Sequence, residues 1–224
     1  MATDTGINLL SAGKQPGNNL PFITYFVNII KAVKDNADVL RASISGPGND
    51  HRLGANEAPP AIISIFTGSE MAKLLDEFEK IGLNPNAPEG NPTMELDIPK
   101  IPSAVLDNTD RNRTSPFPFI GNRFEFRAAG STQNCSLPMM TLNTLVADQL
   151  VSFKKSVDEK ISSGSPKELA IIEILQGYIS DSKSIIFNGD GYSREWELEA
   201  KKRGLANVKT CLLYTSPSPR DKRL

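Results

Sequence analysis

The sequence predicts a fold that mixes helices with a small amount of sheet, α/β or α+β, because two helix-rich ends flank a centre of short strands and long loops. Apolar residues spaced three and four apart indicate helices in both ends of the chain. In the centre, Ala61 to Phe66 is a short apolar, β-branched run that is typical of a buried strand. Asn122 to Arg127 alternates charged with aromatic side chains, as a strand with one solvated face does.

Composition excludes several classes of protein. The 224 residues suffice for one or two domains with a packed core, and 25 Lys and Arg against 26 Asp and Glu give a net charge of −1. This balance predicts no nucleic-acid partner. We expect no membrane partner and a cytoplasmic location, since no apolar run could span a bilayer and the first residues lack a signal-peptide pattern. Two cysteines, Cys135 and Cys211, and the single His51 favour neither a disulfide framework nor a zinc site.

The first half of the chain predicts helices on either side of the first strand. One should run from Leu20 to Val33, with an interruption at Asn36 to Asp38. After the strand, Ser69 is expected to cap a helix that stops at Gly82. The buried stripe of that helix comprises Met71, Leu74, Leu75 and Phe78. Residues 84–102 are rich in Pro, Asn and Gly and predict a surface excursion with one alternating run at 94–98.

The second half predicts three helices. The longest has its buried stripe at Leu142, Leu145, Val146, Leu150, Phe153, Val157 and Ile161. Ser165 to Glu168 is a capping box with Pro at the first helical position. The helix behind it should bury Leu169, Ile172, Leu175 and Ile179. Ser193 and Gly204 bound the last helix, in which Trp196 is expected to be a packing residue.

The loop from Asn49 to Pro60 concentrates polar groups before the first strand. It holds Arg52 and Glu57, with Gly54 between them where the backbone can turn or approach a ligand closely. Loops on a rigid scaffold often present binding groups. A solvated turn with unrelated charges is the alternative interpretation.

A second group of charges lies further along the chain. A strand over 122–127 would place Arg123, Glu125 and Arg127 on one face and both phenylalanines on the other. Together with Arg52, Glu57 and Arg113, this set suits a site for phosphates and carboxylates, because Arg binds both bidentately and a carboxylate can hold Mg²⁺. An ordinary half-exposed strand has the same pattern, so that alternative stays open.

Four blocks, residues 4–10, 49–60, 107–117 and 122–127, resemble glutamine synthetase, specifically the large type III form. The resemblance covers Ala2 to Thr210. It implies part of the catalytic domain, with a partial antiparallel-rich sheet flanked by helices and a helical C-terminal portion.

The resemblance implies a ligase that uses ATP and Mg²⁺ or Mn²⁺ to join glutamate and ammonia through a γ-glutamyl phosphate. It implies a ring-based homo-oligomer in the full-length parent. Arg52 and Arg127 correspond to glutamate-binding arginines, and Arg113 and Arg123 to arginines at the phosphates and nucleotide. Glu57 corresponds to the flap glutamate that takes a proton from ammonium, and Glu125 to a metal ligand.

The chain also departs from the shorter type I pattern. Arg52 and Glu57 are one residue closer together, and Pro118 stands where type I has a further phosphate arginine. The small N-terminal domain and most metal carboxylates of the family have no counterpart here. We therefore expect a fragment that is inactive alone. A non-catalytic assembly protein with the same scaffold, or another carboxylate–amine ligase, is the alternative.

The last residues differ from everything before them. Cys211 to Asp221 can be back-translated without mismatch into a transposase-type sequencing-library adapter. We therefore expect the native domain to comprise residues 1–210 and the tail, 211–224, to be non-native.

Overall fold

The structure is a computed structural model that describes residues 3–46, 49, 52–54, 58–86, 93–94, 104–105, 110, 114–128 and 134–209. Its helices are α1 (Leu20–Asp35), α2 (Ala37–Ile44), α4 (Gly68–Ile81), α5 (Ser136–Ser162), α6 (Lys167–Ser182) and α7 (Arg194–Lys202), with 3-10 turns η1 (Pro16–Asn18) and η2 (Lys183–Ile185). Its strands are β1 (Ile65–Phe66), β2 (Thr93–Met94), β3 (Ala104–Val105) and β4 (Phe117–Pro118). This confirms the predicted mixed class.

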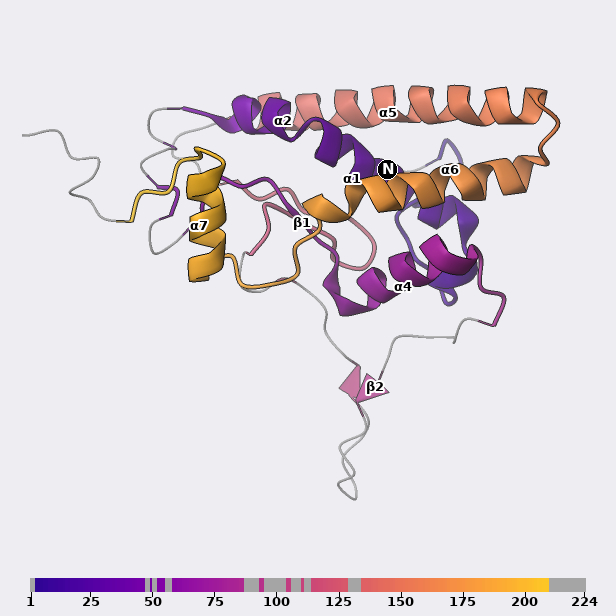
Figure 1. Cartoon of the computed structure of the whole chain (residues 1–224), viewed down its shortest axis with the longest axis horizontal. Helices are drawn as coiled ribbons and strands as arrows, with labels where there is room; N and C mark the ends of the chain where they lie inside the picture. Colours follow the sequence, from indigo (N-terminus) through magenta and orange to yellow (C-terminus); the bar gives the residue numbers. More distant parts are fainter. Residues whose placement is uncertain are drawn as a thin grey trace, which may run out of the picture.

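Helix α1 is the centre of the helical layer. It packs against both α5 and α6, while α4 packs on α6 and α2 on α5. In Figure 1, α5 runs along one edge of the molecule, with α6 next to it and α4 beyond α6. The predicted break after α1 is present, because Asn36 separates α1 from α2. The buried residues of α1 are Phe22, Ile23, Phe26, Val27, Asn28, Ile29, Ile30, Ala32 and Val33.

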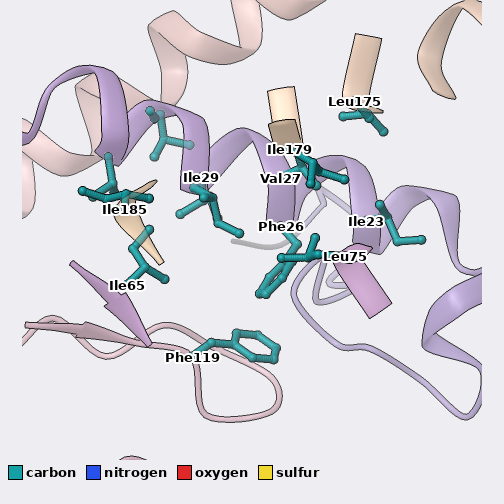
Figure 2. Packing of buried hydrophobic residues seen from close by; sticks show 14 of the residues in the cluster. Ile23, Phe26, Val27, Ile29, Ile65, Leu75, Phe119, Leu175, Ile179 and Ile185 are labelled. Atoms are coloured by element: carbon teal, nitrogen blue, oxygen red, sulfur yellow. The ribbon is translucent and has the colours of Figure 1, made fainter. Parts of the chain in front are cut away.

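The core lies between this helical layer and the small sheet. Figure 2 shows Val27 beside Ile179 of α6, whereas Phe26 faces Phe119 next to β4. The Phe26 and Phe119 ring centroids are 4.7 Å apart in an edge-to-face arrangement. Ile65 of β1 is fully buried in the same cluster. Helix α1 therefore contacts both layers, through different sides of the helix.

The sheet in the core is parallel, which corrects the antiparallel-rich expectation. β1 pairs parallel with β4, with Ile65 opposite Phe117, and Ile65 also forms a parallel bridge with Ile186. Helix α4 lies between β1 and β4 in the sequence, and α5 and α6 lie between β4 and Ile186. Parallel neighbours need a crossover of about a dozen residues or more, which is usually helical. Within the described ranges, antiparallel pairing is limited to β2 with β3 and to the bridge between Phe119 and Phe124.

The first predicted strand is shorter than expected and its following helix is capped differently. Only Ile65 and Phe66 of the run 61–66 form a strand. Ser69 does not cap α4: the helix begins at Gly68, and its first N–H groups are satisfied by the remote Asn188. The Asn188 Oδ1 accepts hydrogen bonds from the backbone N–H groups of Thr67 (2.9 Å) and Gly68 (3.1 Å). The predicted stop at Gly82 is confirmed, with φ of 74°.

The C-terminal helices form where predicted, but two details differ. Pro166 is the N-cap of α6 and no side chain caps it, so the predicted capping box does not form. Ile161 (37% exposed), at the end of α5, and Leu169 (47% exposed), in the first turn of α6, are not buried. By contrast, the Ser193 side chain caps α7 as expected. Trp196 is the predicted packing residue and stacks on Phe187 with centroids 3.8 Å apart.

Within the predicted excursion over 84–102, the structure describes residues 84–86 and 93–94. Of the predicted alternating run at 94–98, only residue 94 is among the described residues. Figure 1 shows β2 well away from the helical body. None of the helices in the described ranges is long and apolar enough to cross a membrane.

Candidate functional site

Residues 116–127 form a hydrogen-bonded hairpin at the edge of the core. The Ile120 N–H donates to the Arg123 carbonyl (2.9 Å), and the Glu125 N–H donates to the Pro118 carbonyl (2.8 Å). The regular pairing is confined to the bridge between Phe119 and Phe124. The predicted strand over 122–127 is therefore an extended hairpin arm rather than a strand of the sheet.

The aromatic residues of this arm fix which side chains face outward. Phe124 stacks on Phe117 (4.7 Å between centroids) and on Phe26 of α1 (5.5 Å). Burying these rings is favourable and leaves the alternate positions, Arg123 and Glu125, exposed. The predicted separation of aromatic and charged faces is confirmed for these residues.

Arg127 joins two carboxylate residues at the base of the hairpin. Its Nε and Nη2 both donate to the Glu125 Oε2, at 2.9 and 2.5 Å. Its Nη1 donates to the backbone carbonyl of Asp110 at 2.7 Å. The guanidinium plane is thus fixed by three hydrogen bonds, and Glu125 and Arg127 share a face as predicted.

Asp110 was not among the predicted site residues. Its side chain is almost fully buried, and its two oxygens accept from the N–H groups of Thr114 (3.2 Å) and Ser115 (3.1 Å). The carboxylate lies 3.9 Å from the Arg127 Nη1. The signal for this role was an Asp before a polar turn, since Asp side chains commonly bind nearby backbone amides. Asp110 is therefore the residue that sets where Arg127 can lie.

The loop that carries Arg52 is closed by backbone hydrogen bonds. The Arg52 N–H donates to the carbonyl of the buried Asn49 (2.9 Å). Gly54 has φ of 84°, and its N–H donates to the carbonyls of Ala58 (3.1 Å) and Pro59 (3.2 Å). Both ends of a short loop are thereby fixed. Glu57 and Arg113, two of the predicted site residues, lie outside the described residues.

The loop and the hairpin meet at one pocket of about 740 Å³. Leu53 and Pro59 line it from the loop, and Pro116 and Arg127 line it from the hairpin. Arg41 of α2 adds a second guanidinium that sequence reasoning did not select. The structure therefore brings Arg127 and the loop that follows Arg52 to the same pocket. Arg123, at the hairpin tip, does not line it.

The described residues do not complete a metal site. Glu125 is the predicted metal ligand, and its Oε2 is engaged by Arg127. Within the described ranges, no group of three or more His, Cys, Asp or Glu could hold a metal ion. Since Mg²⁺ requires six oxygen ligands, Glu125 can supply at most part of its coordination.

Comparisons with known proteins agree with the four sequence blocks. A family model of the glutamine synthetase C-terminal domain matches residues 170–221, a range that reaches into the tail after Thr210. The chain is 53% identical over 209 residues to a glutamine synthetase of Bacteroides fragilis (strain YCH46), covering 93% of this chain and 29% of that protein. It is 45% identical over 210 residues to the type-3 glutamine synthetase of Dictyostelium discoideum, covering 93% of this chain and 28% of that protein. A glutamine synthetase of Butyrivibrio fibrisolvens is 42% identical over 222 residues, with coverages of 96% and 30%.

The matched chain has a mixed fold with an arginine–carboxylate cluster beside a pocket. The chain belongs to the glutamine synthetase family, and its similarity to a type-3 protein confirms the resemblance to the type III form. It spans less than a third of the length of the relatives named above, 28–30%.

Proposed function

We propose that the protein to which this chain belongs is an ATP-dependent ligase that forms glutamine from glutamate and ammonia through a γ-glutamyl phosphate. The observation that carries the proposal is Arg127, which Glu125 and Asp110 hold in place and which lines a pocket shared with the Arg52 loop. The names of relatives up to 53% identical support the same reaction. In such a reaction, most of the catalysis is positioning and neutralisation of charge.

Arg127 is prepared to bind a carboxylate. Its Nε and one Nη2 N–H donate to Glu125 and one Nη1 N–H donates to the Asp110 carbonyl, so these bonds fix the guanidinium with three of its five N–H groups and leave one on each Nη for a substrate carboxylate. An arginine fork binds carboxylates with defined geometry, and a fixed fork loses little freedom on binding. We therefore assign Arg127, with Arg52, to the glutamate substrate.

The remaining roles follow the family resemblance. Arg113 and Arg123 would neutralise the phosphates, and Glu57 would accept a proton from ammonium. ATP would supply the phosphoryl group, and Mg²⁺ or Mn²⁺ would offset its negative charge. Glu125 would provide one ligand of that cation, with the others coming from residues outside this chain. The proposal includes a ring-based homo-oligomer and a cytoplasmic location for the full-length protein.

The test replaces Glu125 with Ala in the full-length protein. We expect Mg²⁺-dependent glutamine formation to fall by at least about tenfold, since even residues that only support a metal ligand contribute that much. The apparent Mg²⁺ requirement should rise, while the melting temperature should change little because Glu125 is exposed.

The matched control is Glu77→Ala, an exposed carboxylate on α4. It should leave both the rate and the Mg²⁺ dependence unchanged. Glu125→Ala enzyme with normal turnover and normal Mg²⁺ dependence would refute the metal role. A wild-type full-length protein that forms no glutamine would refute the proposed reaction.

A further inference from the structure

The segment Leu205–Lys209, which follows α7, lies against the loop that carries Arg52. The Val208 N–H donates to the Leu53 carbonyl at 2.6 Å, and the Ala61 N–H donates to the Ala206 carbonyl at 3.2 Å. These two hydrogen bonds flank the loop, one on each side of residues 54–60. We call residues 205–209 the strap, because they are hydrogen-bonded to Leu53, before residues 54–60, and to Ala61, after them.

Gly54 is the point of closest approach between loop and strap. A Cβ at this position would lie 2.2 Å from the Asn207 Oδ1 and 2.8 Å from the Val208 nitrogen. The first contact is with a side chain, but the second is with backbone that the hydrogen bond to Leu53 holds in place. The positive φ of Gly54, 84°, is a second reason why only glycine fits. The loop and the strap can therefore lie this close together only because residue 54 has no Cβ.

The strap is itself fixed to the C-terminal helix. The Leu205 N–H donates to the Ala200 carbonyl at the end of α7 (2.9 Å), and Lys209 forms an ion pair with Glu197 of α7. Helix α7 is held in turn by the stack of Trp196 on Phe187. A chain of contacts thus leads from the body of the protein through α7 and the strap to the residue after Arg52.

We propose that the strap is a positioning element for Arg52, with Gly54 and the Val208 N–H as its two decisive contacts. This inference rests on the proposed function, in which Arg52 binds the substrate glutamate. No strap residue needs to touch the substrate; the strap fixes the backbone on which Arg52 is carried. It gives the C-terminal region, in which the family match lies, a direct part in the affinity for glutamate.

The test compares Gly54→Ala with Gly164→Ala in the full-length protein. Gly164 also has a positive φ (99°), but nothing lies within 4 Å of a Cβ added there. The control therefore reproduces the backbone strain without the close approach. For Gly54→Ala we expect the KM for glutamate to rise about tenfold or more, because a displaced Arg52 would lose a charge-assisted hydrogen bond to the substrate. The change in kcat should be smaller. Gly164→Ala should leave both constants unchanged.

Hydrogen exchange supplies a reading that does not depend on activity. The amides of Gly54 and Ala61, which bond within the loop and to the strap, should exchange faster in the Gly54→Ala protein and not in Gly164→Ala. Should Gly54→Ala fail to fold, the glutamate KM and hydrogen exchange are measured on Val208→Pro instead, with the same expected changes. It removes the N–H that donates to Leu53 and leaves Gly54 intact.

The outcomes separate this inference from the function on which it rests. Suppose that the wild-type enzyme is active and that Gly54→Ala equals Gly164→Ala in its glutamate KM and in its hydrogen-exchange rates. That result would overturn the role of the strap and leave the proposed function standing. A fall in kcat and thermal stability with an unchanged glutamate KM would also overturn it, since that result shows a merely structural contact. Wild-type enzyme without glutamine formation would overturn the proposed function and the positioning role together.

Discussion

Asp110 shows how a single buried residue can fix the arginine that we propose binds glutamate. Its oxygens bind two consecutive backbone N–H groups, those of Thr114 and Ser115, and its own carbonyl accepts from Arg127. The backbone around the residue is thus held from both sides. Glu125 accepts the other two hydrogen bonds of Arg127. The orientation of Arg127 therefore depends in part on a neighbour, Asp110, that does not line the pocket.

We predict that Asp110→Asn destabilises the protein by about 1–3 kcal/mol. The amide replaces one acceptor with a donor that points at a backbone N–H, and a buried unpaired polar group costs about that much. Denaturant unfolding measures the effect. Asp38→Asn is the control, because the Asp38 side chain is 88% exposed and its ion pair with Arg41 lies at the surface. Equal, small effects of both changes would contradict the prediction.

At the scale of elements, α4 is held in place from the chain that follows α6. Asn188 caps its first turn, and Lys183 of η2 forms ion pairs with Asp76 (2.9 Å) and Glu79 (2.5 Å) on its last two turns. Hydrogen bonds to Glu79 and then Asp76 raise the pKa of Lys183 above its ordinary value of 10.5. The docking of α4 therefore includes an electrostatic contribution that depends on pH.

The sign of that dependence follows from the direction of the shift. Because the folded protein binds the Lys183 proton more tightly, the contribution is complete below 10.5 and is lost as the pH rises through the raised pKa. We expect Lys183→Met to lower stability by roughly 0.2–1 kcal/mol at neutral pH, as for other half-exposed ion pairs. Melting temperatures of both proteins should converge at strongly alkaline pH. The exposed Lys155→Met serves as control, and a difference that persists at alkaline pH would rule out the electrostatic origin.

At the scale of the whole molecule, the chain exposes apolar surface along α5. The exposed large apolar side chains of that helix are Leu137, Met139, Met140, Val151 and Ile161. Leu137, Met139 and Met140 lie together on its first turn, and an exposed apolar group of this kind commonly marks an interface. Because the chain spans less than a third of its relatives, residues of a longer parent are the simplest cover for it.

We predict that this chain by itself forms no glutamine. Within the described ranges, no group of three or more His, Cys, Asp or Glu could hold a metal ion, so the charge on a transferring phosphate would be poorly neutralised. We also expect association at high concentration through the exposed face of α5. An ATP-dependent glutamine assay and light scattering on the purified chain are the measurements. Clear turnover that Glu57→Ala abolishes would show that the chain holds a complete site.

The sequence alone determined most of the helices and the charged face of the hairpin. Periodic apolar residues indicated α1, α4, α5 and α6 correctly, because the spacing of buried positions is a property of each helix by itself. The alternation of Phe124 and Phe126 with charged residues likewise indicated the exposed positions, since successive side chains of an extended chain point to opposite sides. The resemblance to glutamine synthetase rested on whole blocks of sequence, and the comparisons with relatives confirmed it.

Only the tertiary structure decided which distant segments meet. Four contacts join residues that are remote in sequence or that no periodic pattern indicates. They are the parallel pairing of β1 with β4, the cap of α4 by Asn188, the hydrogen bond from Arg127 to Asp110 and the packing of the strap on Gly54. Local patterns specify the path of one segment, whereas these contacts depend on how several packed segments are placed in space. That placement is set by burial of the shared core around α1, a quantity that belongs to the whole chain and to no single segment.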